Sequence, residues 1–306
     1  MCDRLRWHTG EPTLSLRPMH LTRLLLFCLL IPAAGIAATP AATPAPPSEA
    51  QVQLEAIIQR QQKLFAQAER AKKADNFDPE QFQVSVQDIC YQYNDWLRRH
   101  PKIAGGYLAY GLLLAKINMT RESTDMLLKA NALDPNIPQV KNQLGNFLAE
   151  EGKPIQAASY FLAAIRLDPN EPLYHFQLGT LLLNARDDFL ASNAWTRAGL
   201  DHTMYLAFKK ASELAPDNLN YSYSFASCFY ALEEPDWNEA LGAWKHVEKL
   251  CKPGLEQQTI WLQEANLLIK LGKDKEAKVL IGTVDVPQLA EQKQKLVALL
   301  SETGNK

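Results

Sequence analysis

The stretch from Ile137 to Asn170 decides the fold of this chain, and it reads IPQVKNQLGNFLAEEGKPIQAASYFLAAIRLDPN. Small residues at Gly145 and Ala157 allow two helix backbones to approach each other closely. Pro169 stops the second helix, because proline has no amide donor and clashes with the preceding turn. The stretch therefore predicts two short antiparallel helices.

The same pattern recurs along the chain, since Gly111, Gly145 and Gly179 stand 34 residues apart. A pair of short helices cannot bury its apolar face alone, so units of this kind stack on one another. The pattern resembles the tetratricopeptide repeat (TPR), and the resemblance covers about 79–286. It implies an all-α fold, an α-solenoid of stacked antiparallel helix pairs (a TPR superhelix) whose inner groove binds proteins or peptides.

Three copies of the repeat are well marked and two or three are degraded. In the copy over about 104–136, Ser123 stands where the repeat has alanine. In the third copy, Pro169 and Pro216 are 47 residues apart instead of 34, so thirteen residues are inserted within about 184–203. The insertion predicts either a longer turn or a short extra helix.

Helices are also predicted on both sides of the repeats. A Gln-rich amphipathic helix lies within 49–78, where an apolar stripe has helical spacing. We favour an N-terminal cap, because the stripe covers little more than three heptads and Gln61 interrupts it; the alternative is a short coiled coil for self-association. A divergent first repeat begins near Pro79, and its first helix is not recognisable. The final segment, 287–306, predicts a capping helix and tail. The stripe contains Leu54, Ile57, Ile58, Leu64, Phe65 and Ala68, and the cap contains Leu289, Leu296, Val297 and Leu300.

The N-terminus has the pattern of a secretory signal peptide over 1–38. Arg23 precedes a short apolar run, and small residues follow through Ala38. The run is shorter than the about 20 residues of a membrane span, so we expect cleavage rather than stable membrane insertion; an uncleaved anchor is the alternative. If translation began at Met19 instead of Met1, the segment before the apolar run would have the usual length for a signal peptide. An Ala/Thr/Pro-rich linker follows at 39–48, and we expect a periplasmic or secreted bacterial protein.

Charge and cysteine content exclude several classes of function. A formal net charge of -2 gives no basic field to attract nucleic acid. The mature chain keeps Cys90, Cys228 and Cys251, which we expect to be reduced and unbridged. No spacing of His, Cys, Asp or Glu predicts a metal site, and no motif predicts a cofactor or a catalytic centre. We therefore expect a non-enzymatic protein.

The function predicted by the resemblance is that of an exported interaction scaffold. Its groove residues come from the first helix of each unit, at fixed offsets from the packing residues. Two alternatives are a self-assembling envelope adaptor, which forms homo-oligomers through the N-terminal helix, and a glycan- or lipid-handling protein with a site at Trp195, Asp201 and His202. The predicted groove residues are Asn142, Asn146, Phe176, Thr180, Tyr223, Ser227, Tyr230 and Asn266.

Overall fold

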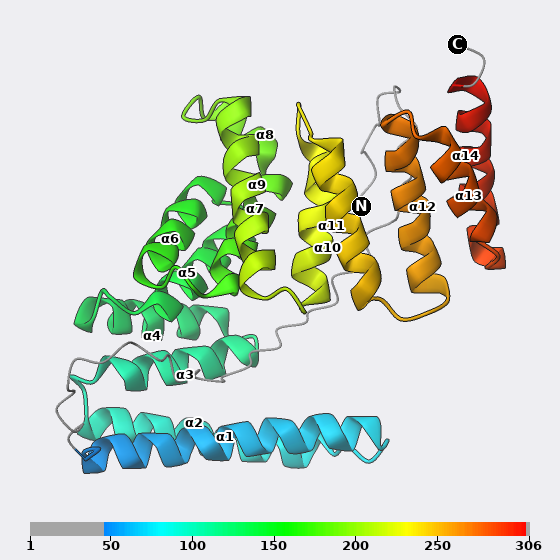
Figure 1. The fold of residues 1–306 in the computed structure, drawn as a ribbon. Coiled ribbons are helices and arrows are strands. Elements are labelled where there is room, and N and C mark those ends of the chain that lie inside the picture. Colours follow the sequence, from blue (N-terminus) through cyan, green and yellow to red (C-terminus); the bar gives the residue numbers. More distant parts are fainter. Residues whose placement is uncertain (1–45, 304–306) are drawn as a thin grey trace, which may run out of the picture. The chain divides into compact units, whose positions relative to one another are not determined.

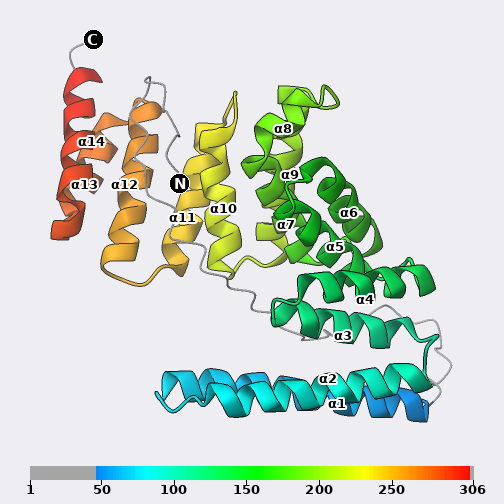
Figure 2. The same cartoon turned by 180° about the vertical axis from the view of Figure 1, so that it is seen from behind.

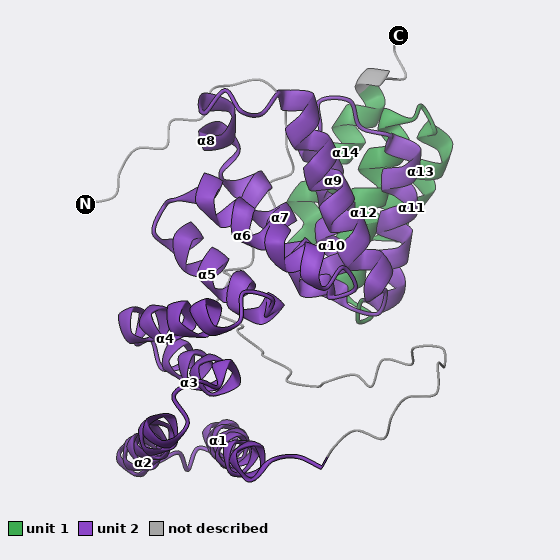
Figure 3. Cartoon of the chain, turned by 90° about the vertical axis from the view of Figure 1, so that its left-hand side faces the viewer, with its two compact units in different colours: residues 1–35, 251–306 green, residues 36–250 purple. Residues whose placement is uncertain are grey.

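The computed structural model describes residues 46–303, and within them every regular element is a helix. The predicted signal peptide, the linker up to residue 45 and the last three residues lie outside this range. The chain divides into two compact units (Figure 3). Among the described residues, 46–250 belong to one unit and 251–303 to the other.

The larger unit is a series of helix pairs in chain order (Figure 1). Helix α3 packs on α4, α5 on α6, α7 on α9 and α10 on α11. This arrangement confirms the all-α solenoid. The helices are α1 (Glu49–Lys73), α2 (Pro79–Arg99), α3 (Ala104–Lys116), α4 (Thr120–Leu133), α5 (Pro138–Glu150), α6 (Pro154–Leu167), α7 (Pro172–Asn184), α8 (Arg186–Ala191), α9 (Arg197–Leu214), α10 (Leu219–Cys228), the 3-10 turn η1 (Phe229–Ala231) and α11 (Trp237–Leu250).

Helix α1 lies along α2, as both views of the fold show (Figure 2). Ser48 caps α1 through a capping box with Gln51, which satisfies amide donors that the helix leaves unpaired. The apolar stripe of α1 packs into one core with α2 and α3, and Ile57 is buried there. In the same core, the Trp96 indole donates to the Ala50 carbonyl at 3.1 Å. The expectation of a first repeat that begins near Pro79 was wrong, because Pro79–Arg99 is one continuous helix and its partner is α1, which begins at Glu49.

A left-handed residue ends the first helix of several pairs. Asn118 and Gly152 have φ angles of 62° and 72° in the larger unit, and Gly272 has 70° in the smaller. The Gly152 amide donates to Ala149 O and the next amide, of Lys153, donates to Leu148 O. This pattern satisfies helix C-terminal carbonyls, and it favours Gly or Asn because other residues are strained at positive φ.

Ser123 has a structural reason to replace alanine. Its side chain is fully buried, and its hydroxyl donates to the Gly111 carbonyl of the paired helix at 2.7 Å. The close approach that brings these atoms together depends on Gly111, where a Cβ atom would lie 3.0 Å from Leu127 Cγ. The first well-marked unit is therefore joined by a hydrogen bond as well as by apolar contact.

The insertion in the third unit forms a short extra helix, which is one of the two outcomes expected. Helix α8 follows α7 directly, and its Phe189 is buried. Phe189 packs edge-on against Trp195, with ring centroids 5.4 Å apart. The chain then enters α9, which at 18 residues is longer than the 14-residue α4 and α6 at the corresponding place.

The smaller unit has its own helix pair and a final helix. Helix α14 packs on both members of the pair, and Leu289 and Leu296 are buried as expected of a cap. Val297 was expected on the covering face, but it is 52% exposed. That expectation was wrong because Leu296 takes the inward position and its neighbour in sequence points away from it. The elements are α12 (Leu255–Lys270), α13 (Asp274–Thr283), η2 (Pro287–Leu289) and α14 (Ala290–Thr303).

Candidate functional site

The predicted groove residues all lie on first helices of the repeats or on the turn that follows. Helix α5 carries Asn142 and Asn146, α7 carries Phe176 and Thr180, and α10 with η1 carries Tyr223, Ser227 and Tyr230. Asn266 lies on α12 of the smaller unit, where it is partly buried. Each of these side chains is uncharged, so the predicted residues offer amide, hydroxyl and aromatic groups.

The two asparagines of α5 differ in exposure. Asn142 is 2% exposed, and its Oδ1 atom has no hydrogen-bond partner. Asn146, one turn later, is only partly buried. A buried acceptor without a partner costs free energy. Asn146 is therefore directly available for a ligand, whereas Asn142 becomes available only when its side chain turns outward.

Aromatic contacts connect the candidate surface of α7 with that of α10. The Phe176 ring lies 4.9 Å from the Tyr221 ring of α10 and 6.2 Å from the Phe208 ring of α9. Thr180, one turn after Phe176, is partly buried. Phe176 therefore serves the packing of three helices while part of its surface remains exposed, so it is both a structural and a candidate contact residue.

Rings also surround the end of α10. Tyr223 packs edge-on against the buried Trp244, with centroids 5.1 Å apart, and the Ser227 hydroxyl donates to the Tyr223 carbonyl at 2.5 Å. Tyr230 is 38% exposed, and its ring lies 5.8 Å from that of Trp237. Tyr230 is thus the most exposed aromatic residue of the predicted set, and its ring packs against that of Trp237.

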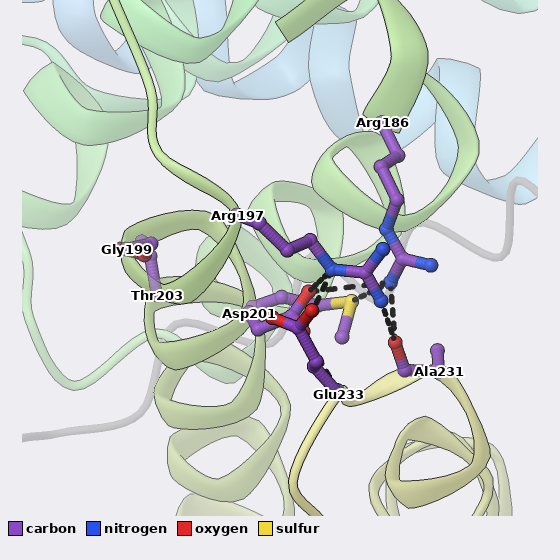
Figure 4. Close-up of polar contacts among 8 residues, drawn as sticks. Arg186, Arg197, Gly199, Asp201, Thr203, Ala231 and Glu233 are labelled. Carbon is purple, nitrogen blue, oxygen red and sulfur yellow. Dashed lines mark hydrogen bonds and ion pairs between the residues drawn. The ribbon is translucent and has the colours of Figure 1, made fainter. Parts of the chain in front are cut away.

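A polar cluster that the sequence did not predict connects the insertion with the turn after η1 (Figure 4). Arg197 Nε donates to both carboxylate oxygens of Asp201 at 2.9 Å, and Arg186 lies 3.6 Å from the same carboxylate. Both arginines donate to the carbonyl of Ala231 at 2.9 Å. The amide of Glu233 donates to Asp201 Oδ2 at 2.9 Å. We call Arg186, Arg197 and Asp201 the arginine–aspartate latch.

The three side chains of the latch differ in exposure to solvent. The Asp201 side chain is 8% exposed, that of Arg186 is 20% exposed and that of Arg197 is 36% exposed. Burial lowers the pKa of Arg186 and the adjacent Arg197 charge lowers it further, while Asp201 raises it. Charge-assisted hydrogen bonds in such surroundings are stronger than neutral ones. The latch is therefore a firm connection between the insertion and the turn after α10.

The predicted glycan- or lipid-handling site does not assemble at these residues. Asp201 is committed to the two arginines and to the Glu233 amide, whereas the neighbouring His202 is exposed to solvent. Trp195 packs on Phe189. Adjacent residues on a helix point about 100° apart, so Asp201 and His202 face different surroundings. That alternative lacks the convergence of side chains that it requires.

A second polar cluster connects α9 with α11. The Tyr205 hydroxyl donates to Glu239, and Lys209 donates to both Tyr205 and Glu239 at 2.9 Å. The hydrogen bond with Tyr205, followed by that with Glu239, raises the pKa of Lys209. Because the Lys209 charge is paired with that of Glu239, we interpret this cluster as a structural connection between α9 and α11.

Residues 46–303 contain neither a metal-binding cluster of side chains nor a membrane-spanning helix. No group of three or more His, Cys, Asp or Glu side chains in this range is placed to hold a metal ion. No helix in the same range is long and apolar enough to cross a bilayer. Cys90 and Cys228 are free thiols, as expected.

Comparison with known proteins agrees with this geometry. Residues 138–171 match the family model described as "Tetratricopeptide repeat". The fold is similar to that of the Pseudomonas aeruginosa protein pilF, with a TM-score of 0.53 and 17% identity, covering 82% of this chain and 99% of that one. It is also similar to YrrB, described as a TPR protein with an unusual peptide-binding site, with a TM-score of 0.51 and 15% identity, covering 70% of this chain and 98% of that one. No curated protein matches the chain.

These findings define the chain first as an α-solenoid built from stacked helix pairs. One of these pairs, at 138–171, matches the tetratricopeptide-repeat model, and the fold over most of the chain is similar to that of solved proteins, one of which is described as a TPR protein.

Proposed function

We propose that the protein is a non-catalytic interaction scaffold, exported to the cell envelope, that binds a peptide segment or helix of another protein along the first helices of its repeats. The observation that carries the proposal is the set of uncharged side chains on the first helices α5, α7 and α10 and on η1. Asn146, Phe176, Thr180, Tyr223 and Ser227 are partly buried, and Tyr230 is 38% exposed.

The chemistry of this surface suits a polypeptide partner. The Asn146 amide offers both donors and an acceptor to a peptide backbone. Tyr223 and Tyr230 offer large rings that lose little conformational entropy on contact. If Asn142 turns outward, its oxygen gains a donor that it lacks in the free protein. The peptide-binding site named for YrrB, a protein of similar fold, supports the same class of partner.

Site-specific photocrosslinking in the native cell tests the groove assignment. A benzophenone side chain at Thr180, on the first helix α7, should capture a protein that the same group at Ser159 does not. Ser159 is exposed on the second helix α6 and so provides the matched control. In addition, Thr180→Arg should abolish co-purification of the captured protein while Ser159→Arg preserves it. Equal capture from both positions would contradict the proposal.

Export is tested separately by sequencing the mature N-terminus. The proposal expects a chain that begins at Ala38 or Thr39 and that is recovered from the periplasm or the medium. An intact N-terminus with the protein retained in the cytoplasm would remove export from the proposal. It would leave the groove assignment in place, because the groove residues all lie beyond the linker.

A further inference from the structure

The first helix of most repeats is followed by a capping residue at positive φ, and the first helix of the fourth repeat is not. At the seventh position after the packing glycine or alanine stand Asn118, Gly152 and Gly272, each at positive φ. Their amides and those of the following residues satisfy the last carbonyls of the helix. The corresponding residues of the third and fourth repeats are Arg186 and Glu233, neither of which is suited to positive φ.

The fourth repeat therefore needs another way to satisfy its helix end. Ala231 ends η1, and its carbonyl accepts from Arg186 and Arg197 at 2.9 Å each. The Glu233 amide, two residues later, donates to Asp201. Cations at a helix C-terminus also interact favourably with the helix dipole. Both sides of the turn are thus held by side chains that belong to the preceding repeat.

We propose that the arginine–aspartate latch, carried by the thirteen-residue insertion, is an external cap that positions the Tyr230-bearing turn of the next repeat. Arg186, Arg197 and Asp201 act as positioning residues for a neighbouring segment. The insertion supplies α8 and the start of α9, which bring all three side chains to one turn. The replacement of two local caps by one shared connection couples the third and fourth repeats.

The consequence concerns the candidate binding surface. Tyr230 lies in η1, directly before the carbonyl that both arginines hold. Its ring contacts Trp237, which begins α11 after the same turn. Loss of the latch therefore frees the backbone on which Tyr230 stands. The effect on binding rests on the function proposed above, whereas the positioning itself can be measured without any partner.

Hydrogen exchange of the full chain tests the proposal. Arg186→Met/Arg197→Met keeps apolar bulk but removes the donors, so the amides of 229–236 should exchange about tenfold faster or more. The amides of α3 to α6 should keep their exchange rates, because α3 and α5 are capped locally by Asn118 and Gly152. Asp201→Asn retains an acceptor for the Glu233 amide but loses its charge, and should give a smaller acceleration confined to 229–236.

A fluorine label at position 230 gives a second readout. 3-Fluorotyrosine in place of Tyr230 should give one narrow resonance in the wild-type background and a shifted or broadened one in the double-Met background. Unchanged exchange at 229–236 together with an unchanged resonance would overturn the proposal. Equal acceleration throughout 104–250 would also overturn it, because that result describes general destabilisation. Failure of the crosslinking experiment leaves both measurements valid.

Discussion

At Gly106, the backbone of α3 lies against the ring of the fully buried Trp96. A Cβ atom built on Gly106 would be 2.1 Å from Trp96 Cζ3. Because the Trp96 indole is fully buried, it has little room to move away and relieve this clash. At the preceding Gly105, nothing lies within 4 Å. Two adjacent glycines thus have different roles, one of close approach and one of helix entry.

We expect Gly106→Ala to lower the free energy of unfolding by about 1–3 kcal/mol, the usual cost of overpacking. Gly105→Ala should leave it within about 1 kcal/mol, because it adds no contact and alanine favours the helix. Urea unfolding followed by circular dichroism measures both. Similar losses for the two variants would show that Trp96 does not determine the requirement for glycine.

Tyr93 and Tyr91 offer a second matched pair on α2. The Tyr93 hydroxyl is buried and donates to Gln61 Oε1 at 2.8 Å, whereas Tyr91 is 74% exposed. Tyr93→Phe leaves the buried Gln61 oxygen without its donor and should cost about 1–2 kcal/mol of unfolding free energy. Tyr91→Phe should change it by less than about 0.5 kcal/mol. The two values come from the same urea titration, and equal values would argue against the buried hydrogen bond.

The buried thiol of Cys228 predicts a dependence of stability on pH. Burial, with a smaller contribution from Glu239, raises its pKa to about 12, whereas an unfolded thiol has a pKa near about 8.5. Between these values the folded state binds more protons than the unfolded state, so stability falls as pH rises.

From pH 8 to pH 10, this group should lower the free energy of unfolding by up to about 2 kcal/mol. Cys228→Ala should show a smaller loss than the wild type over the same interval, although its stability at pH 8 is lower because of the lost packing. An identical pH dependence in the two proteins would show that the thiol is not responsible.

At the scale of an element, α1 illustrates how one apolar stripe admits two uses. The stripe packs with α2 and α3, so self-association through it requires the helix to leave its own core. We expect Ile57→Asp to destabilise the α1–α2 pair by several kcal/mol, because it buries a charge without a partner. Val52→Asp on the same helix should be tolerated, because Val52 is 54% exposed.

Limited proteolysis and light scattering distinguish the two uses. Ile57→Asp should make residues 46–99 sensitive to protease. We expect the wild type to be a monomer in solution and the variant to have the same molecular mass. A wild-type oligomer that Ile57→Asp converts to a stable, protease-resistant monomer would instead support self-association through α1.

At the scale of the whole molecule, the predicted groove residues carry no formal charge, although the chain has 32 basic and 34 acidic residues. Binding through a neutral surface depends weakly on ionic strength, because screening acts on charges. Capture of the partner crosslinked at Thr180 should therefore change less than about threefold between 0.05 and 0.5 M NaCl. A steep loss of capture with salt would indicate that charged residues outside the predicted set dominate binding.

The sequence predicted much of the fold because the same kinds of residue recur at the packing positions of successive repeats. Gly145 opposite Phe161 is one example: a Cβ at Gly145 would lie 2.7 Å from that ring. The sequence did not predict the pairing of α1 with α2, because no glycine of the 34-residue series falls in α1. The exposure of the candidate site was also not predictable, since Asn142 and Asn146 share a face but differ in burial.

Local sequence determined the class of this protein, since helix periodicity, small residues at close approaches and prolines at helix ends act over a few residues or one 34-residue period. Only the tertiary structure decided the role of the insertion. Arg186 and Ala231 are 45 positions apart, and their hydrogen bond depends on the stacking of two repeats. Contacts of that range leave no periodic trace, because their geometry arises from packing rather than from spacing along the chain.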